Sequence, residues 1–221
     1  MVLLALVSSA VLARSDPAAF RVLAREDGPI EWLAVVGYVL IGGLWLHRAV
    51  SLRSHRPALF VSLAMLYGLV FLSFAAEEIS WGQRIFAFES GEFFERHNDQ
   101  RETNLHNLVL DGTSVNRVLS KVAALVGVIY ALVLPVVYES NIRLRKWIDR
   151  LAIPVPRLRQ VVAILLVGLL VALTPSRRNH ELTESALPFI VLLVFLYPRN
   201  EALFRRHLHA EPATPSAHEI L

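Results

Sequence analysis

Long apolar blocks alternate with short polar connections along this chain. The blocks are Met1–Ala13, Ile30–Leu46, Ala58–Ala76, Val122–Tyr138, Val161–Leu173 and Ala186–Tyr197. A helix that crosses a bilayer needs about 20 predominantly apolar residues, so the shorter blocks must include flanking residues to span one. The pattern predicts an all-α fold, a polytopic membrane bundle of about six transmembrane helices. The first block also fits the apolar core of a signal peptide, and both alternatives place residue 14 on the same side of the membrane.

The composition supports this class of protein and excludes others. Hydrophobic residues make up 55% of the chain, more than in an ordinary soluble domain. The chain has no cysteine, which excludes disulfides, thiolate chemistry and a cysteine metal site. Its basic residues are almost all arginine and flank apolar blocks, so they indicate contact with the lipid bilayer and no nucleic acid partner.

The distribution of basic residues predicts how the chain is oriented. Lys and Arg concentrate in residues 47–57, in residues 139–159 and in the stretch after residue 198. Cytoplasmic connections carry such an excess, so we expect an N-in/C-in protein of the bacterial inner membrane. The loop at residues 77–113 then faces the periplasm. It is strongly acidic, with Glu77, Glu78, Glu89, Glu92, Glu95, Asp99, Glu102 and Asp111.

The predicted domain organisation is simple. Residues 1–209 form a single transmembrane helical domain, and residues 210–221 form a flexible C-terminal tail. Short interfacial helices are expected in the outer loop, residues 77–113. The segment 139–159 interleaves bases with apolar residues, and its stretch Asn141–Arg159 predicts a helix that lies on the anionic inner leaflet.

Paired carboxylates end the third apolar block. The rise from Pro57 places Glu77 and Glu78 at the outer hydrocarbon boundary. If the helix continues, Glu77, Trp81 and Arg84 share one face, while Glu78 points toward another neighbour. A specific role for this pair and a solvated helix end both fit the pattern.

The segment Glu102–Asn107 combines an acid, two amides and an imidazole. In an extended backbone, Glu102, Asn104 and His106 face one way and Leu105 anchors the opposite side. His106 is then a candidate metal ligand or general acid/base. Hydrogen bonding to the loop backbone is the alternative role for these residue types.

A third polar cluster precedes the last apolar block. Asn179 is a good N-cap, and His180 and Glu184 follow with a spacing that places both on one helix face, where they could hold a metal ion. Acids in a first helical turn are equally expected from the helix dipole. Arg177 and Arg178 lie beside this cluster and could neutralise the acidic loop or bind a phosphate headgroup.

Three motifs carry a resemblance. Residues Glu26–Glu31 (EDGPIE), Glu77–Arg84 (EEISWGQR) and Glu102–Asn107 (ETNLHN) resemble those of a group of uncharacterised bacterial multi-pass membrane proteins. The likeness covers roughly residues 20–110 and is most specific in the middle motif. It implies a multi-pass membrane fold and no particular activity.

Two functions fit these features. The first is a membrane enzyme, dependent on a divalent metal, that acts on a lipid or lipid-linked substrate at headgroup level. Its candidate catalytic residues are Glu77, Glu78 and His106, and its candidate metal ligands are Glu77, His106, His180 and Glu184. Candidate substrate-binding residues are Trp81, Gln83, Arg84, Glu102, Asn104, Asn107, Arg177 and Arg178. The second is a non-catalytic accessory or assembly subunit that docks a membrane-complex partner through its acidic loop. A transporter is disfavoured because charged groups are missing from the helix interiors.

Overall fold

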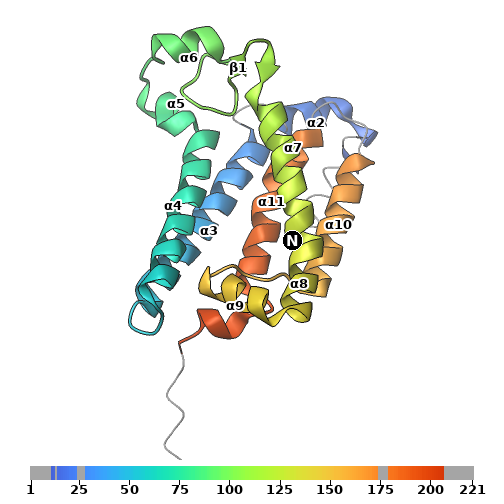
Figure 1. The fold of residues 1–221 in the computed structure, drawn as a ribbon. Coiled ribbons are helices and arrows are strands. Elements are labelled where there is room, and N and C mark those ends of the chain that lie inside the picture. The colour runs from blue at the N-terminus through green and yellow to red at the C-terminus, as the bar shows by residue number, and fades with distance from the viewer. Residues whose placement is uncertain (1–10, 13, 24–27, 174–178, 207–221) are drawn as a thin grey trace, which may run out of the picture.

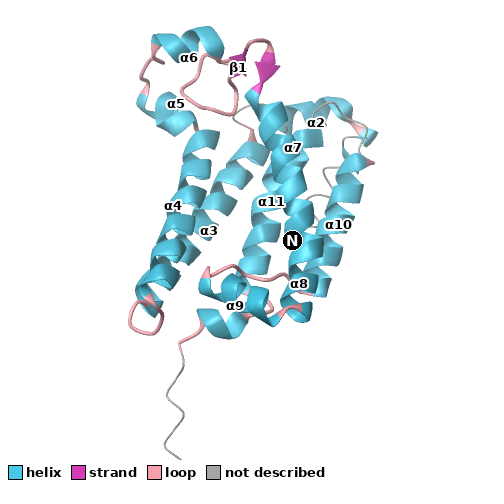
Figure 2. Ribbon diagram, viewed as in Figure 1, coloured by secondary structure: helices cyan, strands magenta, loops and turns pink. Residues whose placement is uncertain are grey.

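The computed structural model describes residues 11–12, 14–23, 28–173 and 179–206, and it is mostly helical. Figures 1 and 2 show a bundle of roughly parallel and antiparallel helices with a layer of short elements across one end. The long helices are α3 (Pro29–Leu52), α4 (Ala58–Glu78), α7 (Val115–Val128), α10 (Leu158–Ala172) and α11 (Asn179–Leu196). The π-helical stretch η2 (Ile129–Val133) joins α7 to α8 (Leu134–Ser140). The shorter elements are α2 (Pro17–Leu23), η1 (Ser80–Gly82), α5 (Gln83–Phe86), α6 (Glu92–His97), the hairpin β1 (Val109–Leu110) and β2 (Thr113–Ser114), α9 (Ile142–Arg150) and η3 (Glu201–Phe204).

Three of the described helical segments are long and apolar enough to cross a membrane. They are Glu31–Leu52, Ala58–Glu78 and Val115–Ser140, while Leu158–Leu170 and Ser185–Leu196 are apolar but shorter. This indicates a membrane protein, as predicted. Six spans and the N-in/C-in orientation stay predictions. The first apolar block falls almost wholly outside the described residues, as does the predicted tail at residues 210–221.

The core lies where α3, α4 and α11 meet. Trp45 of α3 is fully buried and packs edge-on against the rings of Tyr67 and Phe195. The backbones of α3 and α4 approach closely at Gly42 and Gly68, where a Cβ on either residue would lie 3.1 Å from the carbonyl oxygen of the other. Small residues at such a crossing let two membrane helices pack tightly.

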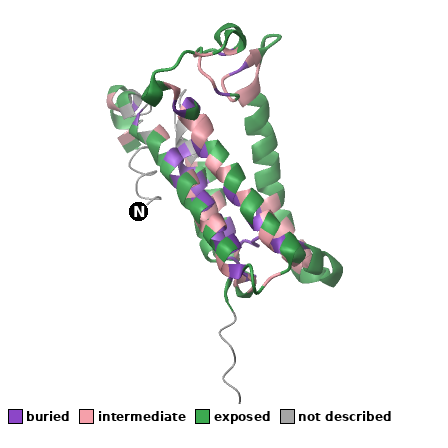
Figure 3. Ribbon diagram, turned by 90° about the vertical axis from the view of Figure 1, so that its left-hand side faces the viewer, coloured by how far each residue is buried: buried purple, intermediate pink, exposed green. Residues whose placement is uncertain are grey.

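The α7–η2–α8 segment lies at the outside of the bundle. Ser114 caps its start by accepting a hydrogen bond from the backbone N–H of Arg117, so the helix includes residues that flank the apolar block starting at Val122. The π-helical stretch precedes Pro135, whose missing N–H and bulky ring prevent regular α-helical hydrogen bonding there. The residues of α7 from 117 to 128 are exposed, as expected for a lipid-facing helix, and Figure 3 colours the residues of the bundle by burial.

The two ends of the bundle differ in chemistry. At one end lies the α4–α7 loop (residues 79–114), beside the start of α3 (Figure 1). The turn between α3 and α4 (residues 53–57) lies at the opposite end, together with α9 and η3 (Figure 1). We call this end of the bundle the basic end. The helix predicted over Asn141–Arg159 is shorter in the structure. It starts after the Asn141 cap and ends at Arg150, where Ala152 adopts a left-handed backbone angle with φ of 55° and the backbone N–H of Ile153 donates to the carbonyl oxygen of Ile148.

Candidate functional site

The helix formed by the third apolar block ends at the paired carboxylates, and it does not continue through Arg84. Helix α4 ends at Glu78, and Ser80, Trp81 and Gly82 all adopt left-handed backbone angles, with φ of 49°, 56° and 80°. A right-handed helix cannot pass through these residues. Glu77 and Arg84 therefore do not share a helix face, and the chain turns across the end of the bundle instead.

Glu77 connects this turn to the segment Glu102–Asn107 by side-chain contacts. Its Oε1 accepts a hydrogen bond from Trp81 Nε1 at 2.7 Å, and its Oε2 accepts one from the backbone N–H of Leu105 at 2.7 Å. The Nδ1 atom of His106 lies 3.6 Å from the same Oε2. The structure thus brings the candidate site residues Glu77, Trp81 and His106 together through a folded loop and not along one helix.

A buried hub of polar groups surrounds Asn104, whose exposed fraction is only 1%. Its side-chain Nδ2 donates to Ser80 Oγ at 2.8 Å and to Glu102 Oε2 at 3.2 Å. The Ser80 hydroxyl also donates to Glu102 Oε2. Asn98 Nδ2 donates to the Oδ1 of Asn104 at 2.8 Å, and the backbone N–H of Asn107 donates to the same oxygen at 3.2 Å. The amide of Asn104 thus has donors and acceptors on both sides, as a buried amide requires.

Gln83 holds a second part of the loop. Its Oε1 accepts hydrogen bonds from the backbone N–H of Thr103 at 2.7 Å and from the Ser90 hydroxyl at 3.1 Å. The Ser90 hydroxyl also lies 2.8 Å from the carbonyl oxygen of Arg101. Because one amide oxygen joins three separate turns, Gln83 serves to fold the loop rather than to present a group to solvent.

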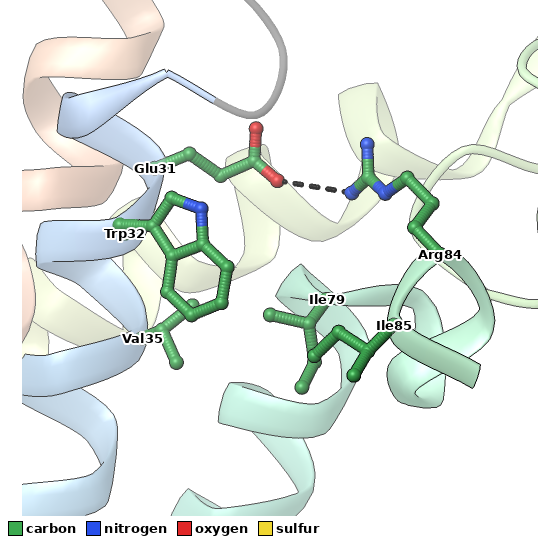
Figure 4. A pocket seen from close by; sticks show the side chains of 6 residues that line it. All are labelled: Glu31, Trp32, Val35, Ile79, Arg84 and Ile85. Atoms are coloured by element: carbon green, nitrogen blue, oxygen red, sulfur yellow. Dashed lines mark hydrogen bonds and ion pairs between the residues drawn. The ribbon is translucent and has the colours of Figure 1, made fainter. Parts of the chain in front are cut away.

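Arg84 connects the loop to the start of α3. Its guanidinium lies 3.3 Å from Glu31 and 3.3 Å from Glu102, so one cation joins two acids from different elements. Figure 4 shows this ion pair above an apolar wall formed by Trp32, Val35, Ile79 and Ile85. The cavity beneath it has a volume of only about 30 Å³, far below the roughly 300–1,000 Å³ of small-molecule sites. The structure brings Glu31, the last residue of the Glu26–Glu31 motif, against the α4–α7 loop.

The prediction that Leu105 anchors the loop is wrong. The Leu105 side chain is 55% exposed, and it is Asn104 that points inward. The hydrogen bond from the Leu105 backbone to Glu77 fixes the chain direction here, and the side chain plays no part in it. Further apolar side chains of this loop are exposed: Trp81, Ile85, Phe86, Phe88 and Phe93.

Part of the predicted site cannot be placed. Arg177 and Arg178 lie outside the described residues, and of His180 and Glu184 the structure describes only the backbone, in the first turns of α11. Glu78 is half-buried at the last residue of α4. Within the described part of the chain, no group of three or more His, Asp or Glu side chains is arranged to hold a metal ion.

The structure adds two site residues that the motifs did not single out as functional. Ser80 is fully buried and joins Glu102 to the end of α4, and Asn98 is buried beside Asn104. Asn98 Oδ1 also accepts from the backbone N–H groups of Gln100 and Glu102. The tendency of Asn to bond the backbone two residues ahead was the available signal.

Comparisons of the chain with protein-family models, curated proteins and solved structures give no match. The resemblance carried by the three motifs therefore stays a prediction.

Proposed function

We propose that this protein is a membrane-anchored accessory subunit that docks a partner protein through its α4–α7 loop. One observation carries this proposal: the polar side chains of the predicted site are used to fold the loop. Glu77, Glu102, Asn104 and Gln83 each bridge segments that are distant in the loop sequence. A loop held this way is pre-organised, and pre-organisation lowers the entropic cost of binding.

The surface of the loop supplies chemistry for such a contact. Phe86 is 75% exposed, and Phe88 and Phe93 are exposed nearby, on and between α5 and α6. Exposed acids accompany them, namely Glu89, Glu92, Glu95 and Asp99. Aromatic side chains contribute most to interface energy, while charges at the rim steer association. The proposed partner therefore presents apolar and basic groups near the membrane surface, on the periplasmic side if the basic end is cytoplasmic.

The docking proposal is tested with a double substitution, Phe86→Ala with Phe93→Ala. The protein is purified in mild detergent with whatever protein co-purifies, and the stoichiometry is measured by mass spectrometry. We expect a stoichiometric partner for the native chain and its loss in the double variant. The matched control, Leu125→Ala with Val126→Ala, removes exposed apolar groups from α7 and should keep the partner. Equal retention in both variants would contradict docking through this loop.

A second candidate function, a metal-dependent enzyme acting on lipid or lipid-linked substrates, is favoured by the pair Glu77 and His106. A carboxylate beside an imidazole is the arrangement that orients a general base or a metal-bound histidine. Divalent metal content and binding of lipid-linked substrates should then fall in His106→Gln. Because Glu77 also holds the loop, Glu77→Gln tests the pair less cleanly. Stoichiometric metal lost on His106→Gln would favour the enzyme over the docking subunit.

A further inference from the structure

A larger cavity lies at the basic end of the bundle, remote from the α4–α7 loop. Its volume is about 350 Å³, within the range of small-molecule sites, roughly 300–1,000 Å³. The last turns of α3 form one wall, and η3 with the residues after it forms another. It is lined by His47, Arg48, Ser51, Leu52, Phe204 and Arg206.

Arg48 is the buried cation of this cavity, with an exposed fraction of 7%. Its Nη2 donates to the carbonyl oxygen of Phe195 at 2.5 Å, and its guanidinium carbon lies 4.5 Å from the ring centre of Phe204. Its Nη1 is buried and has no hydrogen-bond partner in the structure. A buried donor on a charged group is costly to leave unpaired, so the position calls for an acceptor.

Arg206 adds a second positive charge to the cavity. Arg206 donates from Nε to the carbonyl oxygen of Ser51 at 3.1 Å, and its side chain is exposed at the cavity mouth. His47 Nε2 lies 3.3 Å from the Ser51 hydroxyl. The described residues that line the cavity include no Asp or Glu. The C-terminal end of α3 contributes about half a negative charge, which two guanidinium groups outweigh.

We propose that this cavity binds a phosphate group, either from an anionic lipid headgroup or from a soluble phosphate. Guanidinium groups pair with phosphate oxygens through charge-assisted, often bidentate, hydrogen bonds. Arg48, whose Nη1 has no hydrogen-bond partner in the structure, lines the cavity, and Arg206 supplies a second, exposed cation on the other wall. The apolar segment Glu31–Leu52 ends at Leu52, so the cavity lies at the membrane boundary, where lipid phosphates are found.

The test is binding by the full-length protein in detergent, measured by native mass spectrometry and by thermal shift. The probes are short-chain phosphatidylglycerol, short-chain phosphatidylcholine and inorganic phosphate. Arg206→Gln removes the exposed cation without disturbing the buried Arg48. Arg143→Gln, an exposed arginine of α9 at the same end, is the matched control for charge. His47→Gln is a second cavity variant in case Arg206→Gln alters folding.

We expect saturable binding of one phosphate-bearing probe, weakened about tenfold by Arg206→Gln and less than about twofold by Arg143→Gln. Preference for phosphatidylglycerol over inorganic phosphate identifies a lipid source, and competition by inorganic phosphate identifies a soluble one. Equal weakening by Arg206→Gln and Arg143→Gln would mean diffuse attraction to the basic end and would overturn the proposal. So would the lack of saturable binding by all three probes.

Discussion

At the residue scale, hydrogen bonds between short polar side chains decide the shape of the α4–α7 loop. Asn104, Ser80 and Asn98 are buried together, and each makes its contacts inside the loop. A buried polar group that loses its partner pays its full desolvation cost, whereas an exposed one exchanges its partner for water. These positions should therefore respond to substitution far more strongly than the exposed charges around them.

Asn104→Ala tests the buried hub. The substitution removes a donor from Ser80 and Glu102 and an acceptor from Asn98, so we expect a loss of about 1–3 kcal/mol in stability. Thermal unfolding in detergent, followed by tryptophan fluorescence, measures the change, and limited proteolysis reports opening of the loop. Asp99→Ala is the control, because Asp99 is exposed and its backbone N–H, not its side chain, makes the bond seen in the structure. Equal effects of both substitutions would contradict the hub.

Arg84→Gln tests the ion pairs that join the loop to α3. Arg84 lies 3.3 Å from Glu31 and from Glu102, and the two acidic side chains are mostly buried, whereas Arg84 is partly exposed. We expect a destabilisation of about 1–3 kcal/mol, since hydrogen bonds to charged groups are lost together. The control is Arg96→Gln, which breaks an exposed pair with Glu92. Exposed pairs contribute little, so that substitution should leave the unfolding temperature nearly unchanged.

At the element scale, the hydrophobic pattern predicted where the long helices lie in the chain but not all the residues at which they begin and end. The observed α4 starts at Ala58 as predicted, because Pro57 and the apolar run after it mark the boundary in the sequence. The turn after α4 was not predicted, because Glu77 to Arg84 also has ordinary helical spacing. The left-handed backbone at Ser80 and Trp81 is accompanied by hydrogen bonds that join Ser80 to Glu102 and Asn104. The residues that make these contacts lie more than twenty positions further along the chain, so the residue pattern around Ser80 does not reveal them.

Gly82→Ala tests that turn. Gly82 has φ of 80°, and a Cβ there would lie 2.9 Å from the ring of Phe86. The left-handed backbone alone costs an L-residue about 1–2 kcal/mol, and the ring must also move. Gly91→Ala is the matched control, with φ of −66° and open space around its Cβ position, so its effect should stay within about 0.5 kcal/mol. Equal unfolding temperatures for the two variants would mean that the backbone of the turn tolerates a side chain at residue 82, and would contradict this prediction.

At the scale of the whole molecule, the two ends of the bundle serve different chemistry. The distribution of charge along the sequence predicted an acidic connection at residues 77–113 and basic ones elsewhere, and the structure places them at opposite ends. The pairing of Arg84 with Glu31 and of Arg48 with Phe195 could not be predicted in detail, because each depends on how α3 packs against other elements. Charge distribution thus indicates the ends, and tertiary packing decides which side chains meet there.

The separation of acidic and basic connections to opposite ends of the bundle also predicts the orientation of the protein in the membrane. Because the chain has no cysteine, single substitutions provide unique sites for a membrane-impermeant maleimide. Asp99→Cys lies in the α4–α7 loop, whereas Ser54→Cys and Ser140→Cys lie at the opposite end, in the turn after α3 and at the end of α8. In intact bacterial cells we expect labelling at residue 99 alone, with residues 54 and 140 labelled only after permeabilisation, since Arg-rich connections are retained in the cytoplasm. Labelling of residues 54 and 140 from outside would invert the orientation and place the proposed docking surface in the cytoplasm. Labelling of all three from outside would mean that the described bundle does not cross the membrane.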